Sequence, residues 1–356
     1  MKIVLVTPLL DHGGGQRFIT ELANYWAKLN HEVSIILLRS GESFYPVSNK
    51  VKIHELGYLH NEGQSKLIRI ISGVRTLYKL RVKIKQIKPH FVLSILSSTN
   101  ILTIFATRKL KTKVYVNDIM SPYRYRTSFE KKMRKTFYKR ANGVIALTKT
   151  AKEIIFKETK SKNIRVIHNP VKDIKTFSNI EKEKIIINVG RLVREKGQKY
   201  LLEVFAKLDN PDWKLVILGE GPLRSSLEEL ATELNIKDNV FMPGAVKNVD
   251  EWLAKASIFA FPSVSESWGL ALAESMAAGL PSVSFDCDVG PREMIIDGDN
   301  GFLVPVENVD MFTDRVKQLI NDKELRNKFS NQVKKDANKY KIEIIGNEIF
   351  DFCTNS

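Results

Sequence analysis

The feature that most constrains this chain is the alternation, from end to end, of short β-branched runs with segments of helical hydrophobic spacing. The runs are mostly continuous rather than alternating, which is typical of parallel strands buried on both faces. Helices are expected between them, for example over 226–234 and 270–278. The pattern predicts an α/β protein with parallel, doubly wound sheets. Strands are expected at 3–6, 33–38, 51–53, 91–95, 114–116, 144–147, 185–189, 214–218, 239–242, 258–261 and 281–285.

The length of 356 residues favours two domains, each with its own sheet. A turn signal at His168-Asn169-Pro170, followed by a charged stretch, marks the boundary. We therefore expect an N-terminal domain over 1–172 and a C-terminal domain over 173–340. Residues 341–356 predict a final helix, and periodicity leaves open whether it packs on its own domain or crosses back to the first.

The two halves differ sharply in charge. Residues 1–172 hold 33 Lys and Arg against 10 Asp and Glu, whereas the remainder holds 23 basic and 30 acidic residues. Such asymmetry indicates a polyanionic partner for the first half: nucleic acid, an anionic membrane or a phosphorylated substrate. A solvated basic surface without a partner is the alternative. Two cysteines, no membrane-spanning apolar run and no signal-peptide pattern at the start favour a cytoplasmic location.

A glycine-rich loop, 13–15, separates the first strand from a helix. Glycines allow close backbone approach, and the start of a helix offers free N–H groups to an anion. The pattern is not GxGxxG, and the second strand ends at Arg39 without an acidic residue, so a nicotinamide dehydrogenase is disfavoured. A tight turn without a ligand is the alternative.

Two further segments of the second half carry candidate chemistry. Arg191 and Lys196 follow its first strand, and Glu266 and Glu274 flank the start of a later helix. Open α/β sheets bind ligands beyond the carboxyl ends of their strands, where cations can clamp a phosphate. Amides at residues 268–270 could face an anion at the helix start. Surface solvation of the cations, with Glu266 capping the helix and Glu274 facing solvent, is the alternative.

Taken in order, the glycine loop, GR-x4-KG, E-x7-E and the DGDNGFLV segment beginning at Asp297 resemble the retaining glycosyltransferases of the GT-B fold. The resemblance spans nearly the whole chain and is strongest to bacterial enzymes that extend lipid-linked oligosaccharides or surface polysaccharides. It implies two Rossmann-like domains facing each other across a cleft. It also implies transfer of a hexose or N-acetylhexosamine from a nucleotide diphosphate sugar, a UDP-sugar, to a hydroxyl of a lipid-linked or polysaccharide acceptor.

The resemblance assigns roles to individual residues. Arg191 and Lys196 neutralise the donor diphosphate, Glu274 accepts hydrogen bonds from the ribose, and Glu266 contacts the transferred sugar. The remaining implied donor contacts are Gly14 and Gly15 over the diphosphate, Val246 and Lys247 at the base, and Ser267, Trp268, Gly269 and Leu270 around the sugar and phosphate. The implied catalytic set is Glu266, Arg191 and Lys196, with no protein nucleophile.

One position departs from the family pattern. Relatives often carry a histidine just after the fifth N-terminal strand, where this chain reads Asn117-Asp118. His12, Arg17 and Asp118 are therefore the candidates for contacts with the acceptor or the transferred sugar. Neither cofactor nor metal is expected. The Asp286-Cys287-Asp288 segment looks like a metal-binding D-x-D but lies where GT-B relatives have a donor-site loop, and the six histidines lack metal-ligand spacing.

The basic residues of the first half cluster in 66–88 and 108–140, interleaved with apolar and aromatic residues. Basic amphipathic helices are typical of membrane surfaces, so an anionic membrane surface is the expected partner, with peripheral binding at the cytoplasmic face. In 66–88 we expect Leu67, Ile70, Ile71, Val74, Leu77 and Tyr78 to pack on the sheet while the lysines face the membrane. No sign of an exposed aromatic sheet or recognition helix is visible, which disfavours nucleic acid.

The sequence thus predicts a metal-independent hexosyltransferase. A GT-B epimerase or hydrolase acting on a nucleotide sugar is the rival enzyme, and a non-catalytic nucleotide-sugar-binding membrane scaffold is the rival without catalysis.

Overall fold

A computed structural model describes residues 1–11, 13–57, 66–174 and 180–355. The chain forms two compact units. The first combines Met1–Pro170 with Ile342–Ser356, and the second is Val171–Lys341. The last helix therefore belongs with the N-terminal residues.

The first unit is built on a seven-stranded sheet of order β3-β2-β1-β4-β5-β6-β7. Its strand pairings are parallel, and the order of the strands along the chain reverses between β1 and β4. The three-residue β7, which is partly polar and lies at an edge, is absent from the strands expected from the sequence. The strands are β1 (Lys2–Thr7), β2 (Glu32–Leu37), β3 (Lys52–Glu55), β4 (Phe91–Ile95), β5 (Lys113–Asp118), β6 (Gly143–Ala146) and β7 (Ile164–Val166).

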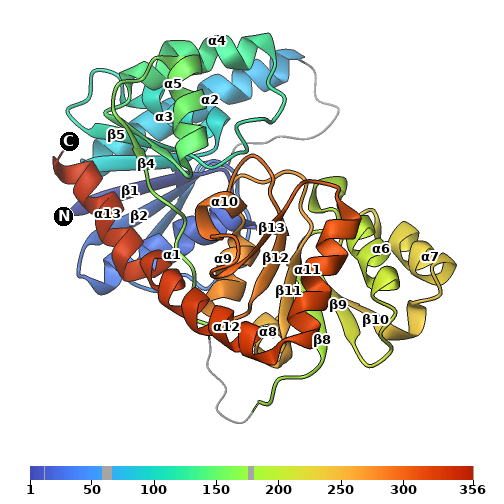
Figure 1. Ribbon diagram of the computed structural model, residues 1–356. Coiled ribbons are helices and arrows are strands. Elements are labelled where there is room, and N and C mark those ends of the chain that lie inside the picture. Colours follow the sequence, from blue (N-terminus) through green and yellow to red (C-terminus); the bar gives the residue numbers. More distant parts are fainter. Residues whose placement is uncertain (12, 58–65, 175–179, 356) are drawn as a thin grey trace. The chain divides into compact units, whose positions relative to one another are not determined.

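Helices cover both faces of this sheet, with α1 and α13 on one face and α2 to α5 on the other (Figure 1). The last helix is held to α1 by a hydrogen bond of 3.1 Å from Trp26 Nε1 to the carbonyl of Gly346. The helices are α1 (Gly14–Lys28), α2 (Lys66–Ile87), α3 (Ser97–Thr107), α4 (Ser128–Phe137), α5 (Lys149–Thr159) and α13 (Ile342–Asn355).

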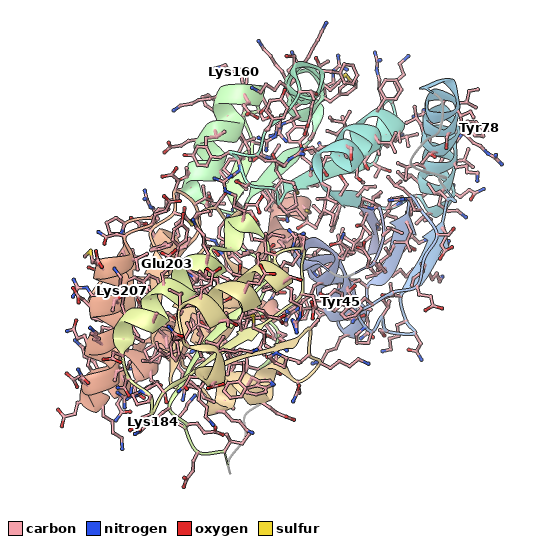
Figure 2. The ribbon with its side chains drawn as sticks, turned by 90° about the vertical axis from the view of Figure 1, so that its right-hand side faces the viewer. Tyr45, Tyr78, Lys160, Lys184, Glu203 and Lys207 are labelled. Atoms are coloured by element: carbon pink, nitrogen blue, oxygen red, sulfur yellow. The ribbon has the colours of Figure 1, made fainter. Side chains whose placement is uncertain are left out.

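The apolar residues of α2 divide between two faces. Leu77 packs against the core, as its helical spacing predicts, and Leu80 and Ile84 are fully buried. Ile71, Val74 and Tyr78 are instead more than half exposed, as is Ile68 at 50%, and Tyr78 projects outward from the helix (Figure 2). The expectation that Ile71, Val74 and Tyr78 pack on the sheet is wrong, because the core takes only one narrow face of this helix. The side chains of Leu67 and Ile70 lie outside the described residues.

The second unit has a six-stranded sheet of order β10-β9-β8-β11-β12-β13, whose strand pairings are again parallel. Its strands are β8 (Ile185–Val189), β9 (Lys214–Leu218), β10 (Val240–Gly244), β11 (Ile258–Phe261), β12 (Ser282–Phe285) and β13 (Gly301–Val304). Its helices are α6 (Gln198–Leu208), α7 (Arg224–Glu233), α8 (Val249–Lys255), α9 (Leu270–Ala277), α10 (Pro291–Met294), α11 (Val309–Asn321) and α12 (Lys323–Ala337).

Both units are parallel sheets with crossover helices, so the expected pair of Rossmann-like domains is confirmed. Strands β4, β8, β9 and β11 begin and end where the sequence predicts, because each is a mostly apolar run whose residues the core largely buries. Among the described residues, none of the helices combines the length and apolarity needed to cross a bilayer.

Candidate active site

In the sheet of the second unit, the order of the strands along the chain reverses between the neighbouring strands β8 and β11. Helices that follow the two strands therefore leave toward opposite faces, and the carboxyl ends of the strands open a crevice. The loop after β8 carries Arg191 and Lys196, and the loop after β11 carries Glu266. Three of the predicted site residues thus lie at the point where open α/β sheets bind ligands.

Two glycines let these loops approach closely. Gly197 has φ of +65°, and a Cβ there would stand 1.9 Å from the carbonyl oxygen of Pro262. Gly219, at the end of β9, has φ of +144°, and its Cβ would meet the carbonyl oxygen of Gly190 at the same distance. Backbone packs against backbone at both places, so a side chain at either would push the site loops apart.

Lys196 and Glu266 form an ion pair between the two loops, with Nζ and Oε1 2.5 Å apart. The Glu266 side chain is 7% exposed and that of Lys196 is 25% exposed. A nearly buried carboxylate needs such a partner, because an isolated charge is costly in a medium of low dielectric constant. Arg191 is exposed, and within the described ranges no carboxylate forms an ion pair with its guanidinium.

The helix α9 starts directly behind Glu266. The first amides of a helix have no intrahelical acceptor. The N-cap of α9 is Gly269, with φ of +104°, and it has no side chain that could accept from them. Trp268 is buried and packs edge-on against Tyr340 at 5.2 Å, which fixes the loop that leads into the helix. Glu274, inside α9, is 7% exposed. The exposed alternative for Glu274 is therefore wrong.

The loop after β12, where the resemblance implies a donor-site loop, packs against this site. A Cβ on Gly290 would lie 2.0 Å from the carbonyl oxygen of Trp268, so this loop packs onto the Glu266 loop. The buried thiol of Cys287 lies in the same surroundings. Burial first, and then the charge of Glu266, raises its pKa to about 12, while Lys196 acts in the opposite direction. A lone cysteine gives no sequence signal for such a place.

The other predicted donor residues lie in the same unit. Val246 and Lys247 belong to the loop between β10 and α8, on the far side of β9 from β8. Asp286 is engaged by Arg292, with distances of 2.9 and 3.1 Å from Nε and Nη2 to its carboxylate oxygens. Across the part of the chain that is described, no cluster of three or more His, Cys, Asp or Glu side chains has the arrangement of a metal site.

In the first unit, Gly14 and Gly15 form the start of α1, next to the switch point between β1 and β4. A Cβ on Gly15 would meet the Ile119 side chain at 2.3 Å, so the start of α1 lies against the segment that follows β5. Arg17 is paired with Glu21 of its own helix, with Nε and Oε1 2.7 Å apart. His12 lies outside the described residues.

Asp118 belongs to a buried polar cluster that the sequence did not reveal. Its Oδ2 lies 2.6 Å from Nη2 of Arg134, and both side chains are at most 2% exposed. Arg134 also donates to Ser97 and to Tyr138 and pairs with Glu158. Burial alone would lower the pKa of this guanidinium, but the charge of and hydrogen bond to Asp118, together with Tyr138 and Glu158, outweigh it and raise the pKa. Oδ2 of Asp118 is thus engaged in an ion pair in the interior of the domain.

A pocket of about 570 Å³ opens beyond the carboxyl ends of β4 and β5. Leu96, which has a φ of +70°, and the start of α3 form one wall, and Arg124 and Glu130 contribute an ion pair of 2.7 Å to the lining. Backbone strain of this kind is concentrated at functional sites. The remaining lining residues are Ser97, Ser98, Ile101, Met120, Phe129 and Met133.

Two family descriptions together match most of the chain. Residues 171–336 match "Glycosyl transferases group 1", and residues 12–173 match "Glycosyltransferase Family 4". These matches divide the chain close to the boundary between its two units.

Full-length relatives carry similar descriptions. One, from Campylobacter jejuni, is 29% identical over 98% of this chain and 97% of its own length. Its name is GalNAc-alpha-(1->4)-GalNAc-alpha-(1->3)-diNAcBac-PP-undecaprenol alpha-1,4-N-acetyl-D-galactosaminyltransferase. The amylovoran biosynthesis glycosyltransferase AmsD of Erwinia amylovora is 25% identical over 96% of each chain.

Solved structures agree in fold. TarM, known from Staphylococcus aureus, matches 100% of this chain and 99% of its own with a TM-score of 0.83 and 17% identity. HepE of Anabaena, solved in complex with UDP and glucose, matches 100% of both chains with a TM-score of 0.82 and 15% identity. Two Rossmann-like units, both family matches and these relatives lead to one conclusion: this chain belongs to the glycosyltransferases of the GT-B fold.

Proposed function

We propose that this chain is a retaining, metal-independent glycosyltransferase that moves a hexose or N-acetylhexosamine from a UDP-sugar to a hydroxyl of a lipid-linked or polysaccharide acceptor. The observation that carries the proposal is the Lys196–Glu266 pair across the β8/β11 switch point, with exposed Arg191 beside it and the uncapped start of α9 behind it. Cations, a buried carboxylate and free amides meet there at one crevice.

These groups suit the departure of a diphosphate. As the bond between the anomeric carbon and the phosphate oxygen breaks, its electron pair moves onto the diphosphate, whose negative charge grows. Arg191 and Lys196 stabilise that charge, and preorganised interactions of this kind typically contribute a few kcal/mol in the transition state. The acceptor hydroxyl attacks from the face that the diphosphate leaves, and its proton passes to the departing phosphate oxygen. No protein nucleophile takes part.

Two carboxylates divide the recognition of the donor between them. Glu266 accepts hydrogen bonds from hydroxyls of the transferred sugar while Lys196 holds it in place. Glu274, fixed within α9, accepts hydrogen bonds from the ribose, and backbone groups at Val246 and Lys247 contact the base. Solved relatives support a nucleotide donor, since HepE was solved with UDP and glucose and with UDP-glucose.

The metal-independent part of the proposal rests on charge. Two cations and a helix start supply positive charge where a divalent ion would otherwise stand. The best candidate for a metal ligand in this unit, Asp286, already binds Arg292 through both carboxylate oxygens.

The acceptor belongs to the first unit in this proposal. Its glycan lies over the pocket beyond β4 and β5, whose volume of about 570 Å³ suits one to two sugar rings. Gly14, Gly15, His12 and Arg17 of the same unit are the candidates for contacts with the sugar or the acceptor. The name of the Campylobacter relative, which includes an undecaprenol diphosphate, supports a lipid-linked acceptor.

We further place the first unit on an anionic membrane at the cytoplasmic face. The exposed apolar face of α2 is formed by Ile68, Ile71, Val74 and Tyr78. The segment 66–88, which is this helix and the residue after it, holds eight basic residues and no acidic one. An exposed apolar stripe among lysines and arginines fits a bilayer interface with anionic lipids. It also explains why an apolar face of α2 is left out of the core.

The donor half of the proposal is tested by thermal unfolding with UDP, GDP, ADP and NAD in parallel. A ligand at 100 times its Kd stabilises the native state by about 2.7 kcal/mol, enough for a shift of several degrees. We expect UDP alone to raise Tm, and the shift to disappear in Glu274→Ala. A shift with NAD alone, or with no nucleotide at all, would contradict the proposed donor site.

A further inference from the structure

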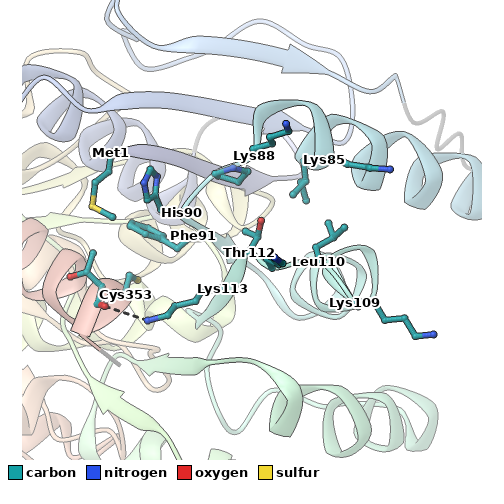
Figure 3. Close-up of a pocket in the computed structure, with 14 residues that line it drawn as sticks. Met1, Lys85, Lys88, His90, Phe91, Lys109, Leu110, Thr112, Lys113 and Cys353 are labelled. Atoms are coloured by element: carbon teal, nitrogen blue, oxygen red, sulfur yellow. Dashed lines mark hydrogen bonds between the residues drawn. The ribbon is translucent and has the colours of Figure 1, made fainter.

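A second hollow lies at the opposite edge of the first sheet from the proposed acceptor pocket. It opens where β4 and β5 begin, next to the ends of α2 and α3, and has a volume of about 720 Å³ (Figure 3). Ligand sites of open α/β sheets lie at the carboxyl ends of strands, so this hollow at the amino-terminal edge is separate from that chemistry.

The lining of the hollow is strongly cationic. Five lysines contribute to it, and no aspartate or glutamate does. Lys85 and Lys88 come from the end of α2, Lys109 follows α3, and Lys113 reaches toward the carbonyl of Thr354 on another side (Figure 3). Over the described ranges, no ion pair engages Lys85, Lys88, Lys109 or Lys111, and all four are exposed. Such a ring of like charge raises the local concentration of anions.

Hydrogen bonding to the end of α3 does not account for Lys109. Arg81 Nη1 already donates to the carbonyls of Ala106 and Arg108, at 2.7 and 2.8 Å. The carbonyls of Ile104, Phe105 and Thr107 accept from Thr107 Oγ1, Arg108 N and Leu110 N. Lys109 therefore has no unbonded carbonyl of that helix end left to serve. Its backbone, like that of Lys88, is also left-handed, with φ of +63° and +52°, a conformation that a non-glycine residue adopts at some cost.

The floor of the hollow is apolar. Ile84, Phe91 and Cys353 are buried there, and Leu110 is partly buried at the side. A cationic rim above an apolar floor suits a ligand that joins a phosphate group to hydrocarbon, rather than a free inorganic ion.

We propose that this hollow binds the phosphate headgroup of an anionic glycerophospholipid, with Lys88, Lys109 and Lys111 around the phosphate and the glycerol over Ile84 and Leu110. The inference deepens the membrane placement given above and rests on it. The hollow lies at the C-terminal end of α2, and the exposed apolar face of that helix occupies residues 68–78. A helix lying in the interface brings its own C-terminal end to the level of the headgroups.

The first test measures binding of a soluble lipid. Dihexanoyl phosphatidylglycerol, below its micellar concentration, is titrated into the full-length protein by calorimetry. We expect saturable binding to one site, weakened at least tenfold in Lys88→Gln/Lys109→Gln/Lys111→Gln. The matched control is Lys152→Gln/Lys157→Gln/Lys160→Gln, which removes the same charge from exposed positions on and just after α5 and should bind as the natural chain does. Absent binding, or equal loss in both triple variants, would overturn the proposal.

The second test uses vesicles and separates this site from the rest of the account. Binding to phosphatidylcholine vesicles with and without phosphatidylglycerol is measured for both triple variants and for Val74→Ser/Tyr78→Ser. We expect the hollow variant to lose the preference for phosphatidylglycerol and the α2 variant to lose binding to both vesicles. If the hollow variant keeps the full preference, the proposal is wrong. Failure of the donor site appears separately, as loss of the UDP-induced Tm shift with lipid binding intact.

Discussion

The ammonium group of Lys196 lies 2.5 Å from the Glu266 carboxylate, and this contact joins the loops that follow β8 and β11. The two residues are far apart in the sequence but neighbours in space, because β8 and β11 are adjacent strands on opposite sides of the switch point. The pair gives a nearly buried carboxylate a cationic partner. Both groups are therefore in position before any substrate binds.

Replacing Lys196 by alanine is expected to lower kcat on the order of 100- to 1,000-fold, because one preorganised charge on the leaving diphosphate is lost. Arg191→Ala is expected to act in the same direction. Steady-state kinetics with the natural donor measures both. Lys199→Ala, an exposed lysine three residues further on, is the matched control and should leave kcat unchanged. An unaltered rate in Lys196→Ala would remove this residue from the diphosphate site.

Replacement of Glu274 and replacement of Glu266 are expected to change different kinetic constants. Loss of hydrogen bonds from a charged acceptor costs about 1.5–3 kcal/mol, so Glu274→Ala should raise KM for the donor roughly 10- to 100-fold. Glu266→Gln keeps the shape of the side chain but removes the charge beside Lys196, and should act mainly on kcat. The affinity of each variant for free UDP, measured without turnover, tests the same contrast. Equal UDP affinity in the natural chain and in Glu274→Ala would disprove the ribose contact.

Gly197→Ala is expected to destabilise the second unit more than Gly298→Ala. Both positions have left-handed backbones, with φ of +65° and +77°, so both replacements incur the left-handed cost of about 1–2 kcal/mol. Only Gly197 faces a backbone carbonyl at 1.9 Å, while a Cβ on Gly298 meets nothing within 4 Å. Crowding should add about 1–3 kcal/mol at Gly197, as measured by urea unfolding. Equal losses at the two positions would contradict the close approach of the loops.

Arg134→Leu is expected to destabilise the first unit by about 3–5 kcal/mol, because it leaves the Asp118 carboxylate buried without its cation. In Asp118→Leu/Arg134→Leu no uncompensated charge of this pair remains, and much of the loss should be recovered. A double-mutant cycle from urea unfolding curves measures the coupling. Additive effects of the two single replacements would show that the ion pair does not act as a unit.

The thiol of Cys287 is expected to remain protonated and unreactive in the native chain. Its folded pKa of about 12 lies above the ordinary value of 9, so its contribution to stability is complete below pH 9 and is lost as pH rises toward 12. The free energy of unfolding, measured at several pH values between 8 and 11, should therefore fall less steeply with pH for Cys287→Ala than for the natural chain. Rapid reaction of Cys287 with a thiol reagent at pH 8, before unfolding, would contradict this prediction.

The hydrophobic pattern and the order of the motifs were enough to predict the two parallel sheets, because parallel strands buried on both faces have nearly continuous apolar sequences. The same pattern did not separate the two faces of α2, since Leu77 and Tyr78 are both compatible with helical spacing and only packing distinguishes them. Contacts between distant segments were hidden for the same reason. The residues around Asp118 in the sequence do not predict its ion pair with Arg134, and those around Cys287 do not predict that Glu266 lies near it.

The central claim is transfer of a sugar with retention, and it is tested most directly by the product. The full-length chain is incubated with UDP-sugars and an undecaprenyl-diphosphate-linked glycan in the presence of EDTA, and the product is examined by mass spectrometry and NMR. The account predicts a glycan one residue longer whose new linkage has the anomeric configuration of the donor. An inverted linkage, free sugar or an epimerised donor as the sole product, or strict dependence on added manganese, would contradict it.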